Sequence, residues 1–484
     1  YKLFFAPETS SSNRCTIGGM VSNNSCGAHS LLYGSTREHL NSIEALLSDG
    51  SEVKFMPLTI KEFNDKCYNN NLEGDIYKQI KKIFSDQSLI DEIKKEYPLP
   101  SIKRRNTGYA LDLLYDNKIF CAESNKPFNF CQLLAGSEGT LTFMHSITLN
   151  LLPLKQKYKG LLCIHFKNIE DAVEANLIIL KYDIAAIEMI DNTIINCALN
   201  HQGYRQNNFF ITGNPSAILI IEFIKDKISD IVKIAKDLEA ELKNKNLGYH
   251  YQLIMGDDDM KKIWAIRKAG LGLISTIRGD AKPVSVIEDT AVAPQDLPSY
   301  IYDLKQLLNK YHLQCVYYGH IATGQLHLKP ILNLKKSKDV ELFKIIAIET
   351  AKLVKKYKGS ISGEHGDGRL RAEFIPLMYG NNIYNTFCEI KKKWDPNNIF
   401  NPGKIINSQA IISNLRYKID NKEKNIKTFF DFSDTDNIIK AVEQCNGSAD
   451  CRKKYIFKGT MCPSYMATLD ETSTTRARAN ILRE

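Results

Sequence analysis

Apolar and polar residues recur along this chain with two different periods, and each period predicts a different kind of element. Residues 60–97 place apolar side chains at helical spacing among lysines, and Pro98 and Pro100 end that pattern. Elsewhere, shorter apolar or alternating runs are bounded by Gly, Asn or Pro, which is typical of strands. The chain is therefore predicted to belong to the α+β class.

The first 153 residues are predicted to form one domain that contains a hairpin. Strands are expected at 40–47 and 52–55, on either side of the turn Ser48-Asp49-Gly50. A glycine-rich turn at 136–140 then leads into a strand at 143–149, which ends before Pro153. We expect this domain to span residues 1–153.

After residue 153 the pattern becomes strand, helix, strand, strand, helix, strand. These elements are predicted at 161–166, 169–181, 185–190, 217–223, 229–242 and 249–255. Their order is that of the ferredoxin-like β-α-β-β-α-β unit. The elements that follow are a helix carrying Trp264 and Arg267, a strand at 284–292, a helix at 297–311, two strands around His320 and His327, and a helix at 339–357.

The remaining boundaries follow from turn-rich and polar segments. We expect the second domain to span 154–375 and residues 376–407 to return to the first domain. A polar linker is expected at 408–428 and a separate C-terminal segment at 429–484. That last segment has few apolar side chains, so we expect it to be the most loosely packed part of the chain, apart from a helix at about 473–483.

Composition narrows the classes of protein. The chain is 43% hydrophobic and 25% charged, as globular proteins are, and its longest apolar runs are too short to span a bilayer. The net charge of +9 is spread over short lysine runs instead of being clustered with aromatic residues, so we expect no nucleic-acid partner. Acidic substrates or an anionic membrane face would also suit this charge. The scattered cysteines indicate a reducing compartment, and we expect a cytoplasmic protein, with peripheral contact at the inner face of the membrane as an alternative.

Three segments carry candidate chemistry. His320 and His327 lie on either side of a short glycine turn, and adjacent strands joined in this way can aim both imidazoles at one point. Glu364 and His365 follow between glycines. Two imidazoles and a carboxylate suit zinc, iron or manganese with positions left open for substrate. Unrelated hairpin histidines and an ordinary glycine-rich loop would produce the same pattern, so the residues alone leave a shared site open.

The third segment, residues 16–27, combines three glycines with hydroxyl and amide side chains. Glycine lets backbone N–H groups approach an anion, and short polar side chains can complete the cradle. The segment is therefore interpreted either as a phosphate-binding loop or as an ordinary surface loop.

Considered together, six segments resemble the FAD-linked D-2-hydroxyacid dehydrogenases, which share the fold of vanillyl-alcohol oxidase and p-cresol methylhydroxylase (PCMH). The segments are SNRCTIGGM at 12–20, GSEGTL at 136–141, YGH at 318–320 with His327, GEHG at 363–366, NPGK at 401–404 and MCPSY at 461–465. The resemblance is strongest to the subgroup fused to an iron–sulfur part. It implies a PCMH-type FAD-binding domain, a ferredoxin-like substrate cap domain, and the start of a ferredoxin-type iron–sulfur domain.

This resemblance also implies roles for particular residues. FAD would be bound by Thr16, Gly18, Gly19, Ser22, Asn23, Gly27, Ser137, Glu138, Gly139, Thr140 and Asn401. A divalent metal, namely zinc, iron or manganese, would be held by His320, His327 and Glu364. His365 would take the hydroxyl proton of the substrate while the C2 hydride passes to the flavin, and Arg267 would bind a substrate carboxylate.

The implied activity is the oxidation of a small D-2-hydroxyacid, such as D-lactate, glycolate or D-2-hydroxyglutarate, to the 2-oxoacid. Electrons would pass through FAD and an iron–sulfur centre to an acceptor, which is a quinone, a cytochrome or a flavoprotein carrier. Cys445, Cys451 and Cys462 would supply three of the four thiolates that a 4Fe–4S cluster takes, and Ser448 stands where a ferredoxin-type run places another cysteine. Two alternatives remain: a flavoenzyme similar to alkyl-dihydroxyacetone-phosphate synthases, which lack the iron–sulfur tail, and a truncated relic without activity.

The sequence also departs from the family pattern. Between the two histidines it has Ala322-Thr323-Gly324-Gln325 where the family often has Gly-Asp-Gly-Asn, a change expected to affect the groups that support the metal ligands. The resemblance implies that the first flavin loop of the family lies upstream of Tyr1 and that a second cluster motif lies beyond Glu484.

Overall fold

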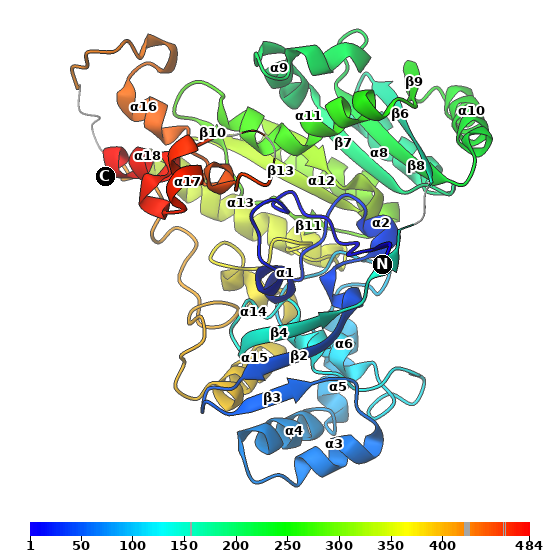
Figure 1. The fold of residues 1–484 in the computed structure, drawn as a ribbon, viewed down its shortest axis with the longest axis vertical. Coiled ribbons are helices and arrows are strands. Elements are labelled where there is room, and N and C mark those ends of the chain that lie inside the picture. The colour runs from blue at the N-terminus through cyan, green and yellow to red at the C-terminus, as the bar shows by residue number, and fades with distance from the viewer. Residues whose placement is uncertain (155–156, 421–425, 458, 460) are drawn as a thin grey trace.

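Two antiparallel sheets organise the computed structural model, which describes residues 1–154, 157–420, 426–457, 459 and 461–484. The larger sheet lies in the upper part of Figure 1 and the smaller sheet in the lower part. Residues 421–425 of the predicted linker lie outside the described ranges. Among the described helices, none combines the length and the apolar composition that a membrane span requires.

The smaller sheet confirms the predicted hairpin and the strand that follows the glycine-rich turn. Its strands are β2 (Leu40–Leu46), β3 (Glu52–Phe55) and β4 (Phe143–Leu149), in the order β3-β2-β4. Three helices confirm the helical pattern at 60–97: α3 (Ile60–Cys67), α4 (Leu72–Ile83) and α5 (Gln87–Glu96). The side chains of Thr59, Asn71 and Asp86 begin these helices by accepting hydrogen bonds from free backbone N–H groups. The shorter elements near this sheet are β1 (Leu3–Phe4), α1 (Ile17–Asn23), α2 (Ser30–Tyr33), α6 (Leu111–Tyr115), α7 (Cys131–Leu134) and β5 (Leu152–Pro153).

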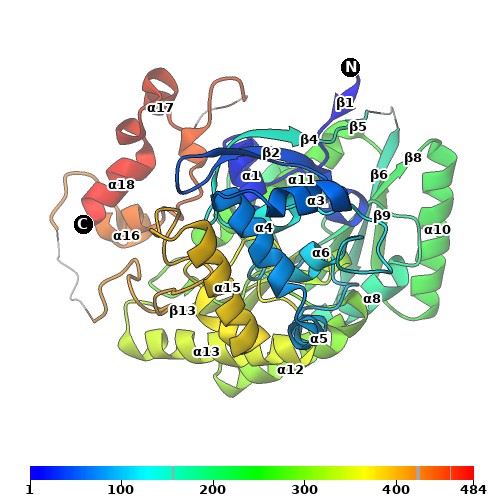
Figure 2. The same ribbon diagram turned by 90° about the horizontal axis from the view of Figure 1, so that it is seen from below.

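The larger sheet contains the predicted ferredoxin-like unit at one end. The strands β6 (Tyr158–Phe166), β7 (Ala186–Asp191), β8 (Ala217–Lys225) and β9 (His250–Ile254) lie in the order β7-β8-β6-β9. Helices α8 (Ile169–Ile179) and α10 (Ile228–Asn244) complete the unit, and α9 (Asn192–Asn200) is inserted after β7. Both crossover helices lie on the β6–β9 side of the molecule in Figure 2. The predicted β-α-β-β-α-β order is therefore confirmed.

The sheet continues beyond this unit through the histidine hairpin. β12 (Cys315–Gly319) pairs with β7 on one side and with β13 (Gln325–Leu332) on the other, and β13 also pairs with β10 (Lys282–Pro283) and β11 (Thr290–Ala291). The helices α11 (Asp257–Ser275), α12 (Leu297–Lys310) and α13 (Ser337–Lys356) agree with the predicted helices around Trp264, at 297–311 and at 339–357.

Two local predictions were wrong. Most of the stretch predicted as a loop at 16–27 is helix α1, because the Thr16 hydroxyl accepts a hydrogen bond from the Gly19 N–H at 3.1 Å and starts a helical turn. The strand predicted at 284–292 is formed only at β11. Asp289 there has a positive φ of 74°, which a strand does not accommodate.

The segment after α13 packs back on the smaller sheet. Helices α14 (Ile375–Tyr379) and α15 (Asn381–Trp394) bring the buried Trp394 ring to 5.4 Å from Phe55 and 5.2 Å from Phe130. Lys391 is also buried, and its Nζ donates to the carbonyl of Thr140 at 2.7 Å and to that of Phe400 at 2.6 Å. These contacts hold the turn at 395–401 against the glycine-rich turn at 136–140.

The C-terminal segment contains α16 (Ile438–Glu443), α17 (Pro463–Thr468) and α18 (Thr475–Arg483), so the predicted terminal helix is confirmed. Phe429 and Phe430 are 98% and 72% exposed, in agreement with the expected loose packing. The segment contacts the rest of the chain through ion pairs. Arg14 lies 3.2 Å from Asp450, and Arg14 Nε donates to the carbonyl of Ser448 at 2.7 Å.

We predict that Lys391→Met destabilises the fold by about 3–5 kcal/mol, because removing one partner leaves the buried Asp395 carboxylate, 2.5 Å away, without its cation. Lys392→Met, at the exposed neighbouring position, should change stability by less than about 0.5 kcal/mol. Urea unfolding followed by tryptophan fluorescence measures both, and equal midpoints for the two variants would contradict the role assigned to Lys391.

Candidate active site

A cavity of about 800 Å³ lies between the N-terminal segment, helix α11 and the histidine hairpin. Helix α11 supplies one wall, with lining residues at helical spacing: Asp257, Met260, Trp264, Arg267 and Leu271. The opposite wall comes from residues 8–11 and 23–29. The volume falls within the range of about 300–1,000 Å³ that is typical of small-molecule sites.

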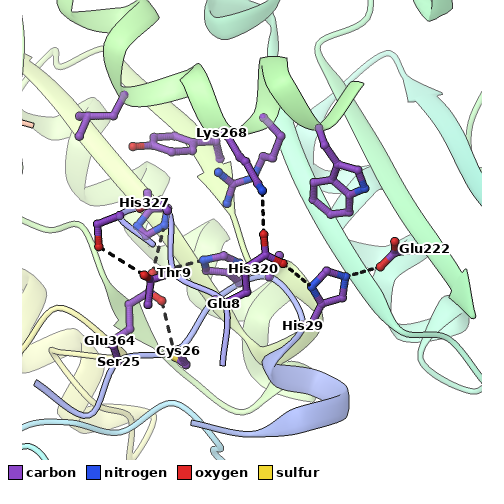
Figure 3. Close-up of a pocket in the computed structure, with 18 of the residues that line it drawn as sticks. Glu8, Thr9, Ser25, Cys26, His29, Glu222, Lys268, His320, His327 and Glu364 are labelled. Carbon is purple, nitrogen blue, oxygen red and sulfur yellow. Dashed lines mark hydrogen bonds and ion pairs between the residues drawn. The ribbon is translucent and has the colours of Figure 1, made fainter. Parts of the chain in front are cut away.

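The three predicted metal ligands meet at the inner end of this cavity. Nε2 of His320 lies 3.2 Å from Oε1 of Glu364, and Nε2 of His327 lies 3.5 Å from the same oxygen. Figure 3 shows the three side chains pointing toward one another. Gly319 permits this approach, because its φ is +138° and a Cβ there would lie 3.0 Å from the backbone nitrogen of His327. The structure therefore brings together the ligand set that the sequence predicted.

His365 stands beside this cluster on its open side. Its ring is stacked on that of His327, with centroids 5.1 Å apart and an angle of 6° between the planes. Nε2 lies 3.6 Å from Oε1 of Glu364, and Nδ1 lies 3.7 Å from Oε1 of Glu288. The side chain is 39% exposed, so this imidazole can exchange a proton with a molecule in the cavity.

Arg104, which the sequence analysis missed, holds Glu364 in place. Its buried guanidinium donates to Oε2 of Glu364 at 2.6 Å and to the carbonyl of Gly27 at 2.6 Å. Burial raises the pKa of Glu364, but Arg104, His320 and His365 together outweigh burial and hold that pKa well below its usual range. The Cys26 thiol donates to the same Oε2 at 3.6 Å. Oε1 is therefore left to face the imidazoles as an ionised ligand.

Asp289 fixes the backbone beneath the cluster. This fully buried carboxylate accepts hydrogen bonds from the N–H groups of Glu364 at 2.9 Å and His365 at 2.8 Å. It also accepts from Nε2 of Gln325 at 2.6 Å, so the residue that departs from the family pattern supports the site through Asp289. Burial, followed by the charge of His365, lowers the pKa of His327 well below its usual range, and a neutral imidazole is the form that binds metals.

Arg267, the predicted ligand of a substrate carboxylate, lines the cavity and already has a partner within the chain. Its Nε donates to Oε2 of Glu188 at 2.7 Å, and its guanidinium lies over the ring of Tyr318 at 5.4 Å. Glu188 was not predicted, although a single acidic residue inside the apolar strand at 185–190 was a usable signal. Burial raises the pKa of Glu188, but Arg267 and His320 lower it to about 2.

The predicted FAD-binding residues occupy three places on the N-terminal wall and the turns next to it. The glycine-rich turn lies against α1, because Glu138 N–H donates to the carbonyl of Ser22 at 2.8 Å, and Asn401 Nδ2 donates to the carbonyl of Glu138 at 2.7 Å. Asn23 and Gly27 line the cavity. The hydroxyls of Ser137 and Thr140 are occupied by backbone carbonyls within the turn.

Two glycines in these segments leave open space beside the backbone. A Cβ added at Gly18 or Gly139 would meet nothing within 4 Å, and Gly139 has a φ of +67°. Gly19 lies at the start of the same helix, next to the capping residue Thr16. Open space beside a glycine backbone suits the close approach of a cofactor phosphate or ring, although none of these three glycines lines the cavity described above. The residues present therefore fit FAD, and their assignment as its ligands remains a prediction.

A second charged cluster, which the sequence analysis missed, lies along the same cavity. His29 Nδ1 is 3.6 Å from Glu8, His29 Nε2 contacts Glu222 on β8, and Lys268 on α11 lies 2.7 Å from Glu8. Figure 3 shows His29 between the two carboxylates. Burial lowers the pKa of His29, but Glu222 and Glu8 outweigh burial and raise it to about 9. This imidazolium links the N-terminal segment to the ferredoxin-like unit.

The predicted iron–sulfur cysteines are only partly brought together. Cys451 and Cys462 are buried in one cluster with Tyr465. Cys445 is half-buried beside Arg416, which donates to its backbone carbonyl. A cubane cluster takes four ligands, and this part of the chain offers only three thiols. The described residues of this segment therefore do not provide a complete cluster site.

Comparisons with known proteins place these features in context. Residues 155–405 match the family model of FAD linked oxidases, C-terminal domain, and residues 1–55 match an FAD binding domain model. A D-2-hydroxyglutarate dehydrogenase of Pseudomonas putida is 30% identical over 502 residues, which cover 100% of this chain and 47% of that protein. Glycolate oxidase subunit GlcD of Bacillus subtilis is 22% identical over 84% of this chain and 72% of its own length.

Among solved structures, p-cresol methylhydroxylase with substrate bound has a TM-score of 0.49 at 12% identity, over 83% of this chain and 70% of that one. This chain matches the D-2-hydroxyglutarate dehydrogenases over its whole length. It spans about half of their length, namely 47%.

We predict that His29→Gln lowers stability most at pH 6 and has little effect above pH 9. The folded pKa of about 9 exceeds the ordinary value of 6.5, so the stabilisation is complete below 6.5 and is lost as pH rises through 9. Thermal unfolding at pH 6, 7.5 and 9.5 measures the difference, which should be on the order of 2 kcal/mol at the lowest pH. The exposed His201→Gln serves as a control. A gap for His29→Gln that stays constant with pH would contradict a charged His29.

Proposed function

We propose, since this chain belongs to the FAD-linked oxidase family, that it takes part in the FAD-dependent oxidation of a D-2-hydroxyacid to the 2-oxoacid. The observation that carries this proposal is the convergence of His320, His327 and Glu364 beside His365 in one cavity. The names of its relatives, which include D-2-hydroxyglutarate dehydrogenase and D-lactate dehydrogenase, support the same substrate class.

The residues of the cavity divide the work of binding and proton transfer. When bound, FAD supplies a two-electron acceptor and a divalent metal at His320, His327 and Glu364 supplies a Lewis acid. Arg267 offers its remaining N–H groups to the substrate carboxylate and thereby orients C2. His365 accepts the proton of the 2-hydroxyl group, a role that suits an imidazole at neutral pH.

The proposal covers a class of substrates and a class of electron acceptors. D-lactate, glycolate and D-2-hydroxyglutarate are all small enough for a cavity of about 800 Å³. Reoxidation requires an acceptor, which we expect to be a quinone, a cytochrome or a flavoprotein carrier. The three cysteines do not complete a cluster site within the described residues.

The direct test is an acceptor-reduction assay on the full-length gene product with a panel of D- and L-2-hydroxyacids. We expect a yellow protein whose flavin is bleached by one or more D-2-hydroxyacids and by no L-enantiomer. A colourless protein, or a flavoprotein that no 2-hydroxyacid reduces, would contradict the proposal.

We predict that His365→Asn slows flavin reduction by about 10²–10⁴-fold, since this is the typical loss when a general base is removed. The variant should keep its flavin spectrum and its metal content, because His365 is the most exposed member of the cluster. Stopped-flow measurement of a single turnover tests this, and an unchanged rate would exclude His365 as the base.

We predict that Arg267→Lys weakens substrate binding and leaves the flavin spectrum unaltered. Lysine keeps the positive charge near Glu188 but loses the planar donor pair that a carboxylate accepts. The rise in KM is the expected result, measured by steady-state kinetics. Equal kinetics for the two proteins would mean that Arg267 serves Glu188 alone.

A further inference from the structure

We propose that Glu188 is a positioning residue that orients both His320 and Arg267, so that one buried carboxylate couples the metal-binding side of the cavity to the carboxylate-binding side. This inference rests on the proposed function and deepens it. Glu188 lies in the middle of β7 and is fully buried. It lies behind both cavity-lining groups and is not itself among the residues that line the cavity.

The two oxygens of Glu188 serve different partners. Oε1 lies 2.6 Å from Nδ1 of His320, and Oε2 lies 2.7 Å from Nε and 2.6 Å from Nη2 of Arg267. The carboxylate of Glu188 is paired with Arg267 and accepts hydrogen bonds, so the contact with His320 places the imidazole proton on Nδ1. This tautomer leaves the lone pair of Nε2 facing Oε1 of Glu364, 3.2 Å away, where a metal would bind.

Glu188 also cancels the charge of Arg267. Within the part of the chain that the structure describes, Arg267 forms an ion pair with no other carboxylate. A carboxylate ligand that enters the cavity therefore competes with Glu188 for the same guanidinium. Glu188 makes both contacts from β7, which pairs with β8 on one side and with β12 on the other. The backbone of Glu188 is therefore fixed, and its carboxylate has little freedom to move away from either partner.

This arrangement predicts that removing the charge of Glu188 lowers the affinity for the metal and raises the affinity for an anion. Glu188→Gln cannot satisfy both partners, because its NH₂ group must face either the His320 N–H or Arg267, and both are donors. We expect metal affinity to fall by about 10–100-fold, as is typical when the hydrogen-bond partner of a metal-binding histidine is lost. Anion affinity in the metal-free protein should rise, because Arg267 loses its compensating charge. If Glu188 merely supported the fold, its substitution would lower both the metal affinity and the anion affinity.

The experiment compares the unmodified chain, Glu188→Gln and Glu73→Gln. Glu73 is the control: it is a buried glutamate on α4 that is paired with Lys66, and it is not among the residues that line the cavity. Mn²⁺ affinity is measured by chelator competition. Pyruvate affinity is measured in EDTA by the fluorescence of Trp264, which lines the cavity, whereas the second tryptophan, Trp394, is fully buried.

We expect Glu188→Gln alone to bind Mn²⁺ more weakly and pyruvate more tightly. Unchanged Mn²⁺ affinity, or weaker binding of both Mn²⁺ and pyruvate, would overturn the inference and leave the proposed function intact. Failure of the unmodified chain to bind Mn²⁺ would overturn the metal site and this inference together. If Glu188→Gln does not fold, as thermal unfolding would reveal, Glu188→Asp replaces it. Aspartate keeps the charge with a shorter reach, so Mn²⁺ affinity should fall while pyruvate affinity does not rise, and any other pattern would overturn the inference.

Discussion

The ion pair between Arg104 and Glu364 is the interaction on which the site depends. It joins two segments 260 residues apart, and both side chains are almost completely buried. An ionised carboxylate is costly to bury without a partner, so the site exists only where the N-terminal part of the chain delivers this guanidinium. Arg104 also donates to the carbonyl of Gly27, the last residue of the predicted FAD-binding segment at 16–27. The guanidinium therefore joins this segment to Glu364.

Around this pair, three buried or half-buried carboxylates each have an opposite charge or a set of donors within reach. Glu188 has Arg267 and His320, Glu288 has Lys329, and Asp289 has backbone N–H groups. The low-dielectric interior strengthens these contacts and makes the loss of any one partner expensive. The cavity therefore presents a pre-organised set of donors and acceptors, which is the property that catalysis and metal binding require.

The sequence allowed much of the fold to be predicted because its signals are local. Hydrophobic period and turn residues located the hairpin at 40–55, the helices at 60–97 and the ferredoxin-like unit. The failures have local causes as well: a capping hydroxyl at Thr16 converted a glycine-rich loop into a helix, and the buried Asp289 interrupted an expected strand. In both places the polar contacts of one residue outweighed the average preference of its neighbours.

The site was predicted only in part, for a different reason. His320, His327, Glu364 and His365 stand in recognisable motifs, but their supporting charges do not. Arg104 lies within the basic run Lys103-Arg104-Arg105, which is typical of a surface, and nothing near it in sequence indicates a partner in a distant loop. Such pairings depend on the folded topology, so neither period nor spacing contains them.

The central claim is that His320, His327 and Glu364 form one divalent-metal site in the cavity that also holds His365. Anomalous X-ray diffraction from crystals grown with Mn²⁺ tests it most directly. The account predicts a single strong peak within coordination distance of Nε2 of both histidines and Oε1 of Glu364. An empty cluster, with Mn²⁺ bound only at surface carboxylates, would contradict it.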